Sequence, residues 1–245
     1  MSTELPPGIA AAWGVRTATK GPRPKLTLEE IVRAAIDAAD EEGLDAVSMN
    51  RLAKRLGASP MGLYRYVSSK EELLELMVDA ALGPIPDAPP GEDWRTGLRR
   101  CATWLTDAMS AHPWSTHVPI TGPPLTPNSV AWLDAALASL GATGLTEGEK
   151  ASVALMLSGY VREHVLLMAD VAANFLGSAE TPDAAMRGYV ETLRGVAPPD
   201  RFPALRAAVD AGVFDRADPP EEELDFGLER ILDGVEALVR RRQTG

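Results

Sequence analysis

The stretch MNRLAKRLGASPMGLYRYV, residues 49–67, indicates both the fold and the function of the N-terminal part of the chain. It carries four basic side chains and no acidic one, although the whole chain has a formal net charge of −11. Ala53 is small, and Gly57, four positions later, tolerates a positive φ, as a tight turn between two helices requires. Ser59 followed by Pro60 predicts a helix start, because a capping hydroxyl precedes a proline at the first helical position.

Two short helices joined in this way form a helix-turn-helix candidate. The first follows the capping residue Ser48, and the second is expected at about Pro60 to Tyr66. Apolar residues at suitable positions close the gap between them: Leu52, Leu56, Ala58, Leu63 and Val67. In a DNA complex the second helix of this motif enters the major groove, while the first crosses the backbone.

The flanking sequence predicts two further helices. Thr27 and Glu30 form a capping box, which begins a helix that ends before Gly43. Ser69 and Glu72 form another, opening a helix through Leu82.

The segment 83–91, GPIPDAPPG, is rich in proline and glycine and marks the predicted domain boundary. Residues 1–25 lack periodicity and are expected to be a flexible basic arm. Its four bases are Arg16, Lys20, Arg23 and Lys25. They either contact phosphates or do nothing.

Charge is distributed unevenly along the chain. Residues 1–83 hold 10 basic and 12 acidic side chains, whereas residues 84–245 hold 14 and 23. A local field can bind an anion even when the molecule repels it overall. The distribution is therefore compatible with one basic face on an acidic protein.

The remainder of the chain has helical periodicity throughout and no alternating strand pattern. The predicted helices are 92–111, 127–141, 146–175, 182–195, 201–212 and 220–242, and Thr146 with Glu149 forms a third capping box. The fold class is therefore all-α. The expected domains are the arm 1–25, a helix-turn-helix domain at 26–83, and a larger helical domain at 84–245.

The run from Leu26 to Leu82, which contains LAKRLG (52–57) and LYRYVSSKEELL (63–74), resembles the N-terminal domain of the TetR family of bacterial transcriptional regulators. FGLERILDGVEALV (226–239) resembles the last helix of members whose C-terminal domain is akin to that of the tetracycline repressor. The resemblance implies a homodimer with an N-terminal DNA-binding domain and a helical C-terminal domain that dimerises and binds an inducer.

The resemblance matches Ser48 and Arg51 with residues that contact the DNA backbone. Met61 and Gly62 offer no side-chain hydrogen bonds, so direct readout falls mainly to thymine-methyl contacts and, if its side chain turns inward, to Arg65. The predicted DNA-binding residues are Thr27, Ser48, Arg51, Ser59, Pro60, Met61, Gly62, Tyr64, Arg65, Tyr66 and Lys70. Tyr64, Tyr66 and Lys70 match the family's phosphate-contacting signature. The alternative is that the tyrosines are ordinary half-buried aromatics and that Arg51, Lys54 and Arg55 form a solvated face.

The C-terminal domain should supply the dimer interface, from the helices 146–175 and 220–242. An apolar stripe on the second, which has Gly227 and Gly234 seven residues apart, is a predicted seam: Leu224, Leu228, Ile231, Leu232, Val235 and Leu238. The alternative is that this stripe packs only within its own subunit.

An inducer pocket should be apolar with a few polar groups. The residues predicted to line it are Trp104, Met109, Trp114, Trp132, Met156, Tyr160, His164, Met168 and Phe175. Each is alternatively plain core, and His164 either pairs with a ligand or is a satisfied core histidine. No cofactor and no metal site are expected.

Little in the sequence indicates an enzyme, and we expect none. Cys101 is either a thiol sensor or a buried small hydrophobe. With no signal peptide and no apolar run long enough to span a membrane, a cytoplasmic protein is expected. The predicted function is a dimeric repressor that binds an inverted-repeat operator in double-stranded DNA and is released by an unknown small-molecule inducer. The alternatives are a small-molecule binding protein with a non-functional helix-turn-helix, and a helical enzyme that borrowed the N-terminal module.

Overall fold

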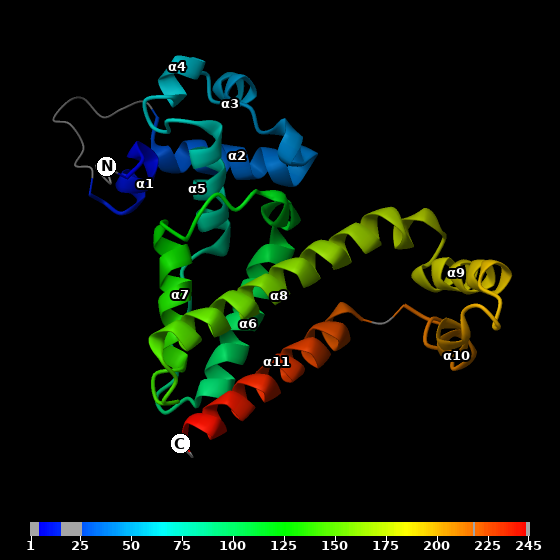
Figure 1. Cartoon of the computed structure of the whole chain (residues 1–245). Helices are drawn as coiled ribbons and strands as arrows, with labels where there is room; N and C mark the ends of the chain where they lie inside the picture. Colours follow the sequence, from blue (N-terminus) through cyan, green and yellow to red (C-terminus); the bar gives the residue numbers. More distant parts are fainter. Residues whose placement is uncertain (1–4, 16–25, 218, 244–245) are drawn as a thin grey trace. The chain divides into compact units, whose positions relative to one another are not determined.

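The computed structural model describes residues 5–15, 26–217 and 219–243, and every regular element in these ranges is a helix (Figure 1). The prediction of an all-α fold is confirmed. The α-helices are α1 Pro7–Ala12, α2 Leu28–Glu42, α3 Met49–Arg55, α4 Pro60–Leu63, α5 Lys70–Leu82, α6 Trp94–Ala111, α7 Pro127–Ser139, α8 Glu147–Asn174, α9 Pro182–Val196, α10 Pro203–Asp210 and α11 Pro220–Gln243. Short 3-10 helices are η1 Leu44–Ala46, η2 Pro113–His117 and η3 Leu176–Ser178.

The chain forms two compact units, residues 1–162 with 235–245, and residues 163–234. The long helices α8 and α11 each pass from one unit to the other. In the described ranges no helix is both long enough and apolar enough to cross a bilayer.

Helix α2 begins with the predicted capping box. The backbone N–H of Glu30 donates to the Thr27 hydroxyl at 3.1 Å, and the Thr27 N–H donates to the Glu30 carboxylate at 2.7 Å. Gly43 follows the last helical residue as the C-cap, and its φ of 82° is readily adopted only by glycine.

The turn between α3 and α4 has the predicted construction. Ala53 is 1% exposed where the second helix crosses the first, and Gly57 adopts a φ of 61°. The predicted apolar residues close the gap, with Leu52, Leu63 and Val67 fully buried.

Helix α4 is shorter than predicted, since it ends at Leu63 and not at Tyr66. The N–H groups of Tyr66 and Val67 both donate to the Leu63 carbonyl, at 2.9 and 3.2 Å. This shared acceptor tightens the chain after one helical turn and directs Val67 into the core.

The prediction of a flexible arm is wrong for the start of the chain. Residues Pro7–Ala12 form helix α1, and Ile9 is 1% exposed in the core of the helix-turn-helix domain. A six-residue helix is too short for its periodicity to be detected in the sequence. The four basic residues at 16–25 lie outside the described residues.

Only half of the predicted second capping box forms at α5. The Ser69 hydroxyl accepts the N–H of Glu72 at 3.1 Å. The Glu72 carboxylate, however, accepts hydrogen bonds from Ser68 and from the N-terminus of α1. A tertiary partner therefore takes the place of the local one.

Helices α6 and α7 pack closely in the first unit. A Cβ atom added to Gly97 would lie 2.6 Å from the Ser139 hydroxyl oxygen, so the two helices meet where α6 has no side chain. The indole N–H of Trp132 donates to the Cys101 carbonyl at 3.3 Å.

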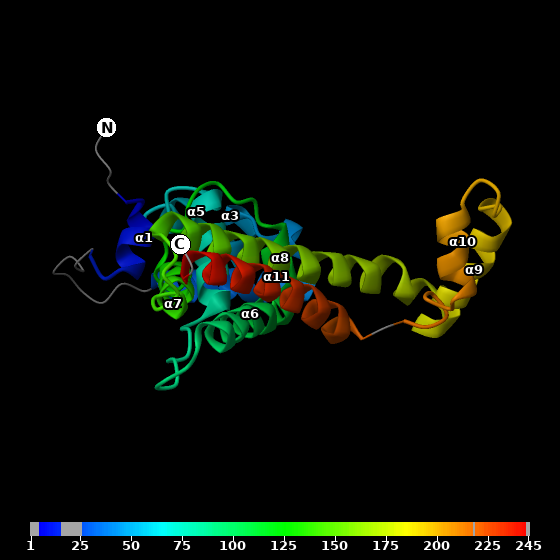
Figure 2. The same cartoon turned by 60° about the horizontal axis from the view of Figure 1, so that its bottom comes forward.

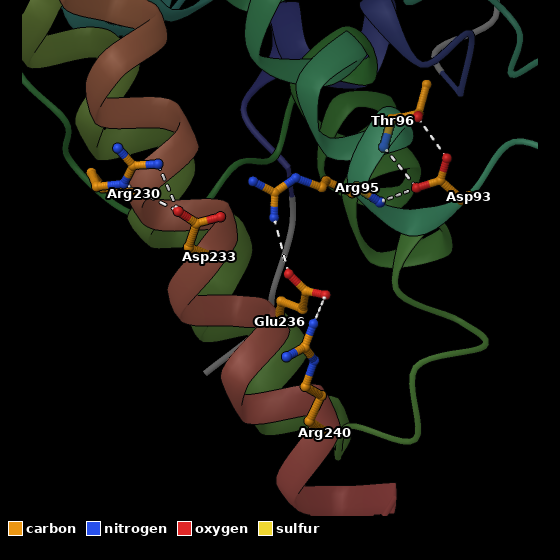
Figure 3. A network of polar contacts seen from close by, with 7 residues as sticks. All are labelled: Asp93, Arg95, Thr96, Arg230, Asp233, Glu236 and Arg240. Carbon is orange, nitrogen blue, oxygen red and sulfur yellow. Dashed lines mark hydrogen bonds and ion pairs between the residues drawn. The ribbon is translucent and has the colours of Figure 1, made fainter.

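The last turns of α11 attach to two other helices of this unit. Arg95 at the start of α6 pairs with Glu236 at 3.6 Å, and Glu236 also accepts from Arg240 at 2.6 Å (Figure 3). At the other contact, Arg242 donates to Glu149 at 2.6 Å. Because Glu149 lies in the first turn of α8 and Arg242 in the last turn of α11, these parts of the two helices run antiparallel, side by side in both views (Figures 1 and 2).

Half of the apolar stripe of α11 is buried within a single chain. Leu228, Leu232 and Val235 are at most 2% exposed within a single chain, and Leu224, Ile231 and Leu238 are half-buried. These three buried residues therefore pack inside their own subunit, as the alternative interpretation holds, and a dimer seam stays a prediction for the three half-buried ones.

The second unit contains a small aromatic cluster. Tyr189 on α9 stacks edge-on against Phe175 and Phe214, with ring centroids 6.0 and 5.8 Å apart. Such T-shaped pairs stabilise a small core beyond the area they bury.

Candidate nucleic-acid interface

The exposed side of α4 and the turn after it presents an apolar and a basic group. Met61 is 74% exposed and Tyr64 is 44% exposed. Arg65 is exposed and has no hydrogen bond or ion pair with any described residue. An exposed guanidinium four residues after an exposed thioether suits a surface that meets phosphate and thymine methyl groups.

Three of the predicted contact residues also serve as helix caps. The hydroxyl oxygens of Ser48 and Ser59 accept the N–H of Arg51 at 3.3 Å and of Gly62 at 3.1 Å. Each serine keeps its own proton for donation to a phosphate. Thr27 differs, because its hydroxyl donates to Glu30 at 3.1 Å. Pro60 and Gly62 are half-buried in α4, and Lys70 is half-buried at the first position of α5.

The two tyrosines have different surroundings. The Tyr66 hydroxyl donates to the Leu26 carbonyl at 2.7 Å, and its ring is half-buried. No described residue binds the Tyr64 hydroxyl. Tyr64 is thus available to a phosphate. Tyr66 joins α4 and the turn after it, residues 60–67 (the recognition segment), to Leu26 just before α2.

Residues 49–67 (the basic window) contain no acidic side chain, but in the structure acids from another helix pair with two of their arginines. Arg51 pairs with Glu42, and Arg55 forms two hydrogen bonds of 2.9 Å with Glu41, both acids at the end of α2. The hydrogen bond and charge of Arg55 hold the pKa of Glu41 below its usual value. Lys54 and Arg65 are the bases of this window that have no ion pair with the described acids.

The core of the helix-turn-helix domain extends into the segment after α6. Trp114 and Val118 are each 6% exposed and belong to the same core cluster as α2 and α5. The Trp114 indole N–H donates to Asp40 of α2 at 2.6 Å, and His112 lies 2.9 Å from the same oxygen. The structure therefore places Trp114 in this core and not with the other predicted pocket residues. In the sequence, a tryptophan that follows a long helix fits either the core of the helix-turn-helix domain or the inducer pocket.

Further polar contacts join α5 and α8 to the same region. Asp79, 6% exposed on α5, accepts the N–H of Ser129 at 2.9 Å and so caps α7. Glu75 accepts from Thr121 at 2.6 Å. From α8, Arg162 donates to the carbonyls of Thr116 and Val118. No sequence motif had identified Asp40, Asp79 or Arg162, because each acts across a long stretch of chain.

The other predicted pocket residues fall in both units. In the first unit, Met109 and Trp132 are buried, Trp104 and Tyr160 are half-buried, and Met156 is 46% exposed. In the second unit, His164, Met168 and Phe175 are half-buried. The buried residues of α8 are different ones, among them Val153, Ala154, Leu157, Val161 and Val165.

A groove of about 610 Å³ lies elsewhere in the first unit, and none of the predicted pocket residues lines it. Its walls are the segment from Ile85 to Trp94 and a row of alanines on α7. Asp87 and Asp134 line it, as does the ion pair of Arg100 with Glu92 at 3.1 Å.

Cys101 is fully buried, and burial raises the pKa of its thiol. This environment disfavours the reactive thiolate and supports its interpretation as a small hydrophobe. Among the described residues, no three His, Cys, Asp or Glu side chains are grouped as metal ligands would be.

Two family models match the chain. One describes a tetracyclin repressor-like C-terminal domain and matches residues 85–239. The other describes bacterial regulatory proteins of the tetR family and matches residues 31–77, which include the helix-turn-helix.

Curated and solved proteins agree with these matches. The chain is 35% identical over 234 residues to the HTH-type transcriptional repressor DrrR1 of Streptomyces coeruleorubidus, covering 93% of this chain and 84% of that protein. It is 30% identical to the class A tetracycline repressor from Escherichia coli, covering 89% and 93%. Among structures, ActR of Streptomyces coelicolor in complex with actinorhodin superposes with a TM-score of 0.72 and 28% identity, covering 87% of this chain and 98% of that one.

Proposed function

The chain belongs to the tetR family of bacterial regulatory proteins, and on this premise we propose that it is a homodimeric transcriptional repressor, released from an inverted-repeat operator by a small organic inducer. The proposal includes no catalytic step, and the relatives reported above carry the names of transcriptional regulators. We propose that it acts in the cytoplasm, where a bacterial operator lies.

The observation that carries the proposal is the construction of the helix-turn-helix. Three features fix α3 and α4: a glycine with positive φ in the turn, a fully buried residue where the helices cross, and a serine cap on each helix. Met61, Tyr64 and Arg65 remain exposed. A helix-turn-helix that no longer bound DNA would not need to keep these three side chains exposed. Phosphate contacts would supply affinity, and the α4 side chains would supply sequence preference.

Dimerisation is proposed through the exposed side of α8. Leu155 is 73% exposed, and Gly159, one turn later, faces open space. A large apolar side chain next to a glycine lets a second helix approach closely while it covers apolar surface. A two-fold axis at this helix would pair two recognition helices, which must lie about 34–36 Å apart to fit successive major grooves.

The inducer is proposed to bind in the C-terminal domain, with the domain boundary at 83–91. Of the predicted lining residues, Trp104, Met109, Trp132, Met156, Tyr160, His164, Met168 and Phe175 remain candidates. ActR of Streptomyces coelicolor forms a complex with actinorhodin, and we extend the binding of a small molecule to this chain.

Coupling between the two sites is proposed to run through α5 and the segment 112–118. Arg162 of α8 binds this segment, and the segment in turn binds Asp40 of the DNA-binding domain. Asp79 adds a second connection from α5 to α7. A ligand that shifts α8 could therefore change the position of α2 and, with it, the spacing of the recognition helices.

The proposal is tested by selection of bound sequences from random duplex DNA, with purified protein at a stated salt concentration. Enrichment of an inverted repeat is expected, and its spacing reports the separation of the two recognition helices. Weak, salt-sensitive binding with no enriched sequence would contradict the proposal and favour the alternative of a ligand-binding protein with a non-functional helix-turn-helix.

A further inference from the structure

A buried carboxylate joins the N-terminal helix α1 to the segment that follows the recognition helix. Glu72 is 4% exposed. Its Oε1 accepts the N–H groups of Gly8 at 2.6 Å and Ile9 at 3.2 Å. Its Oε2 accepts both the N–H and the hydroxyl of Ser68, the latter at 2.7 Å. Four donors and the N-terminal ends of two helices thus stabilise one buried negative charge.

Helix α1 fits against this segment with no space to spare. A Cβ atom on Gly8 would lie 2.8 Å from Leu76 Cδ1, 2.9 Å from Glu72 Oε1 and 3.1 Å from the Tyr66 carbonyl oxygen. Tyr66 and Leu76 therefore both touch the backbone of α1. Ile9, the next residue, is buried in the domain core.

The recognition helix needs such external support. With four residues, α4 has little more than one turn, and a helix of that length is not stable by itself. After α4, Tyr66 is held by Leu26 on one side and faces Gly8 on the other, and Ser68 is held by Glu72.

We propose that α1, acting through Glu72, positions the recognition helix, so that Gly8 and Glu72 are positioning residues for sequence-specific DNA binding. The inference rests on the proposed function. Neither residue is expected to touch DNA. Base-edge contacts require an accurate position of α4, whereas phosphate contacts tolerate small shifts. Loss of the α1 contact should therefore lower specific affinity more than non-specific affinity.

The test compares Gly8→Leu with Ala12→Leu, a matched change at an exposed position of the same helix. Fluorescence anisotropy at one salt concentration gives the affinity for the selected operator and for an unrelated duplex. Gly8→Leu is expected to lower operator affinity about tenfold, with non-specific affinity retained to within about twofold, and Ala12→Leu should match the wild type. Partial unfolding would lower both affinities in the same proportion, so their ratio separates positioning from simple loss of fold.

Ser68→Ala provides a second variant in case Gly8→Leu does not fold. Ser68 is exposed and is not the cap of α5, so its loss should preserve the fold while it removes one hydrogen bond to Glu72. A smaller fall in the ratio is expected. An unchanged ratio in the folded variants would overturn the inference alone. If the wild type itself prefers no duplex, the proposed function fails instead.

Discussion

At the scale of single residues, the two tyrosines of the recognition segment should separate binding from stability. Tyr64→Phe removes a hydroxyl that no described residue binds, and it should lower DNA affinity by about 1 kcal/mol with no change in Tm. Tyr66→Phe removes the 2.7 Å hydrogen bond to Leu26 and should lower the free energy of unfolding by about 1 kcal/mol. Anisotropy and thermal melts on both variants provide the measurement. Equal effects of the two changes on stability would contradict this assignment.

The ion pair between Arg55 and Glu41 should limit electrostatic attraction to DNA. Glu41→Gln removes one negative charge and frees the Arg55 guanidinium, so non-specific affinity should rise. The slope of log K against log salt should become steeper by about one unit, because one more cation can reach a phosphate. The matched control is Glu29→Gln, which removes the same charge from an ion pair with Arg33 at the other end of α2. If both variants steepen the slope equally, the effect is one of net charge alone.

At the scale of elements, sequence patterns predicted nearly every long helix to within two residues. Thr27 with Glu30 and Thr146 with Glu149 form the expected capping boxes, because all partners lie within one turn. Periodicity then defines α2, α6 and α8, since each buries one face.

Elements that depend on tertiary contacts were missed. Helix α1 is fixed by Glu72, a residue 64 positions away in the chain, and η2 by Asp40, 74 positions from Trp114. For the same reason, the sequence predicts a recognition helix that is three residues too long at its C-terminal end. Its last residues turn toward Leu26 and the core, and no local pattern encodes that turn.

The same limit applies to the candidate sites. The predicted DNA-facing residues follow one motif of about 20 residues, and in the structure Met61, Tyr64 and Arg65 are exposed. The pairing of Arg51 and Arg55 with acids of α2 could not be predicted, because it depends on how α3 crosses α2. Of the residues predicted to line the inducer pocket, Trp114 lies instead in the core of the helix-turn-helix domain.

The junction of α8 with α11 should depend on pH through Glu149. The hydrogen bond from Arg242, with the Thr146 backbone, lowers the pKa of Glu149 from 4.5 to about 2. Because the folded pKa is the lower one, the stabilisation is complete above about pH 4.5 and is lost as the pH falls toward 2. Glu149→Gln should therefore be less stable than the wild type at pH 7, and this difference in Tm should shrink between pH 4.5 and the lowest pH at which both chains fold. A difference that is constant with pH would show that the carboxylate charge does not matter.

At the scale of the whole molecule, the proposed dimer makes the exposed face of α8 sensitive to charge. Leu155→Glu would place two carboxylates near a two-fold axis and should convert the dimer to monomers. The control, Ile120→Glu, changes a residue of the same exposure, 74% against 73%, in a loop outside α8. Sedimentation velocity at micromolar concentration distinguishes the species. A dimeric Leu155→Glu chain, or an Ile120→Glu chain that dissociates equally, would place the interface elsewhere.

A dimer responds to its inducer only if the two sites of each chain are coupled, and the indole of Trp114 lies at the proposed junction. Trp114→Phe keeps most of the buried ring but removes the 2.6 Å hydrogen bond to Asp40. The measured quantity is the ratio of operator affinities without and with inducer, which typically lies between about 5 and 150 in coupled systems. This ratio should fall several-fold toward one, while the free protein still binds operator.

The control is Trp132→Phe, which removes an equally buried indole N–H from a hydrogen bond to Cys101 within the C-terminal helices. Inducer affinity can change in either variant, yet the ratio at saturating inducer reports only the coupling. If Trp132→Phe lowers the ratio as much as Trp114→Phe, then coupling is spread through the whole helical packing and does not depend on the contact between Asp40 and segment 112–118. If Trp114→Phe leaves the ratio intact, the Asp79 connection between α5 and α7 becomes the principal route.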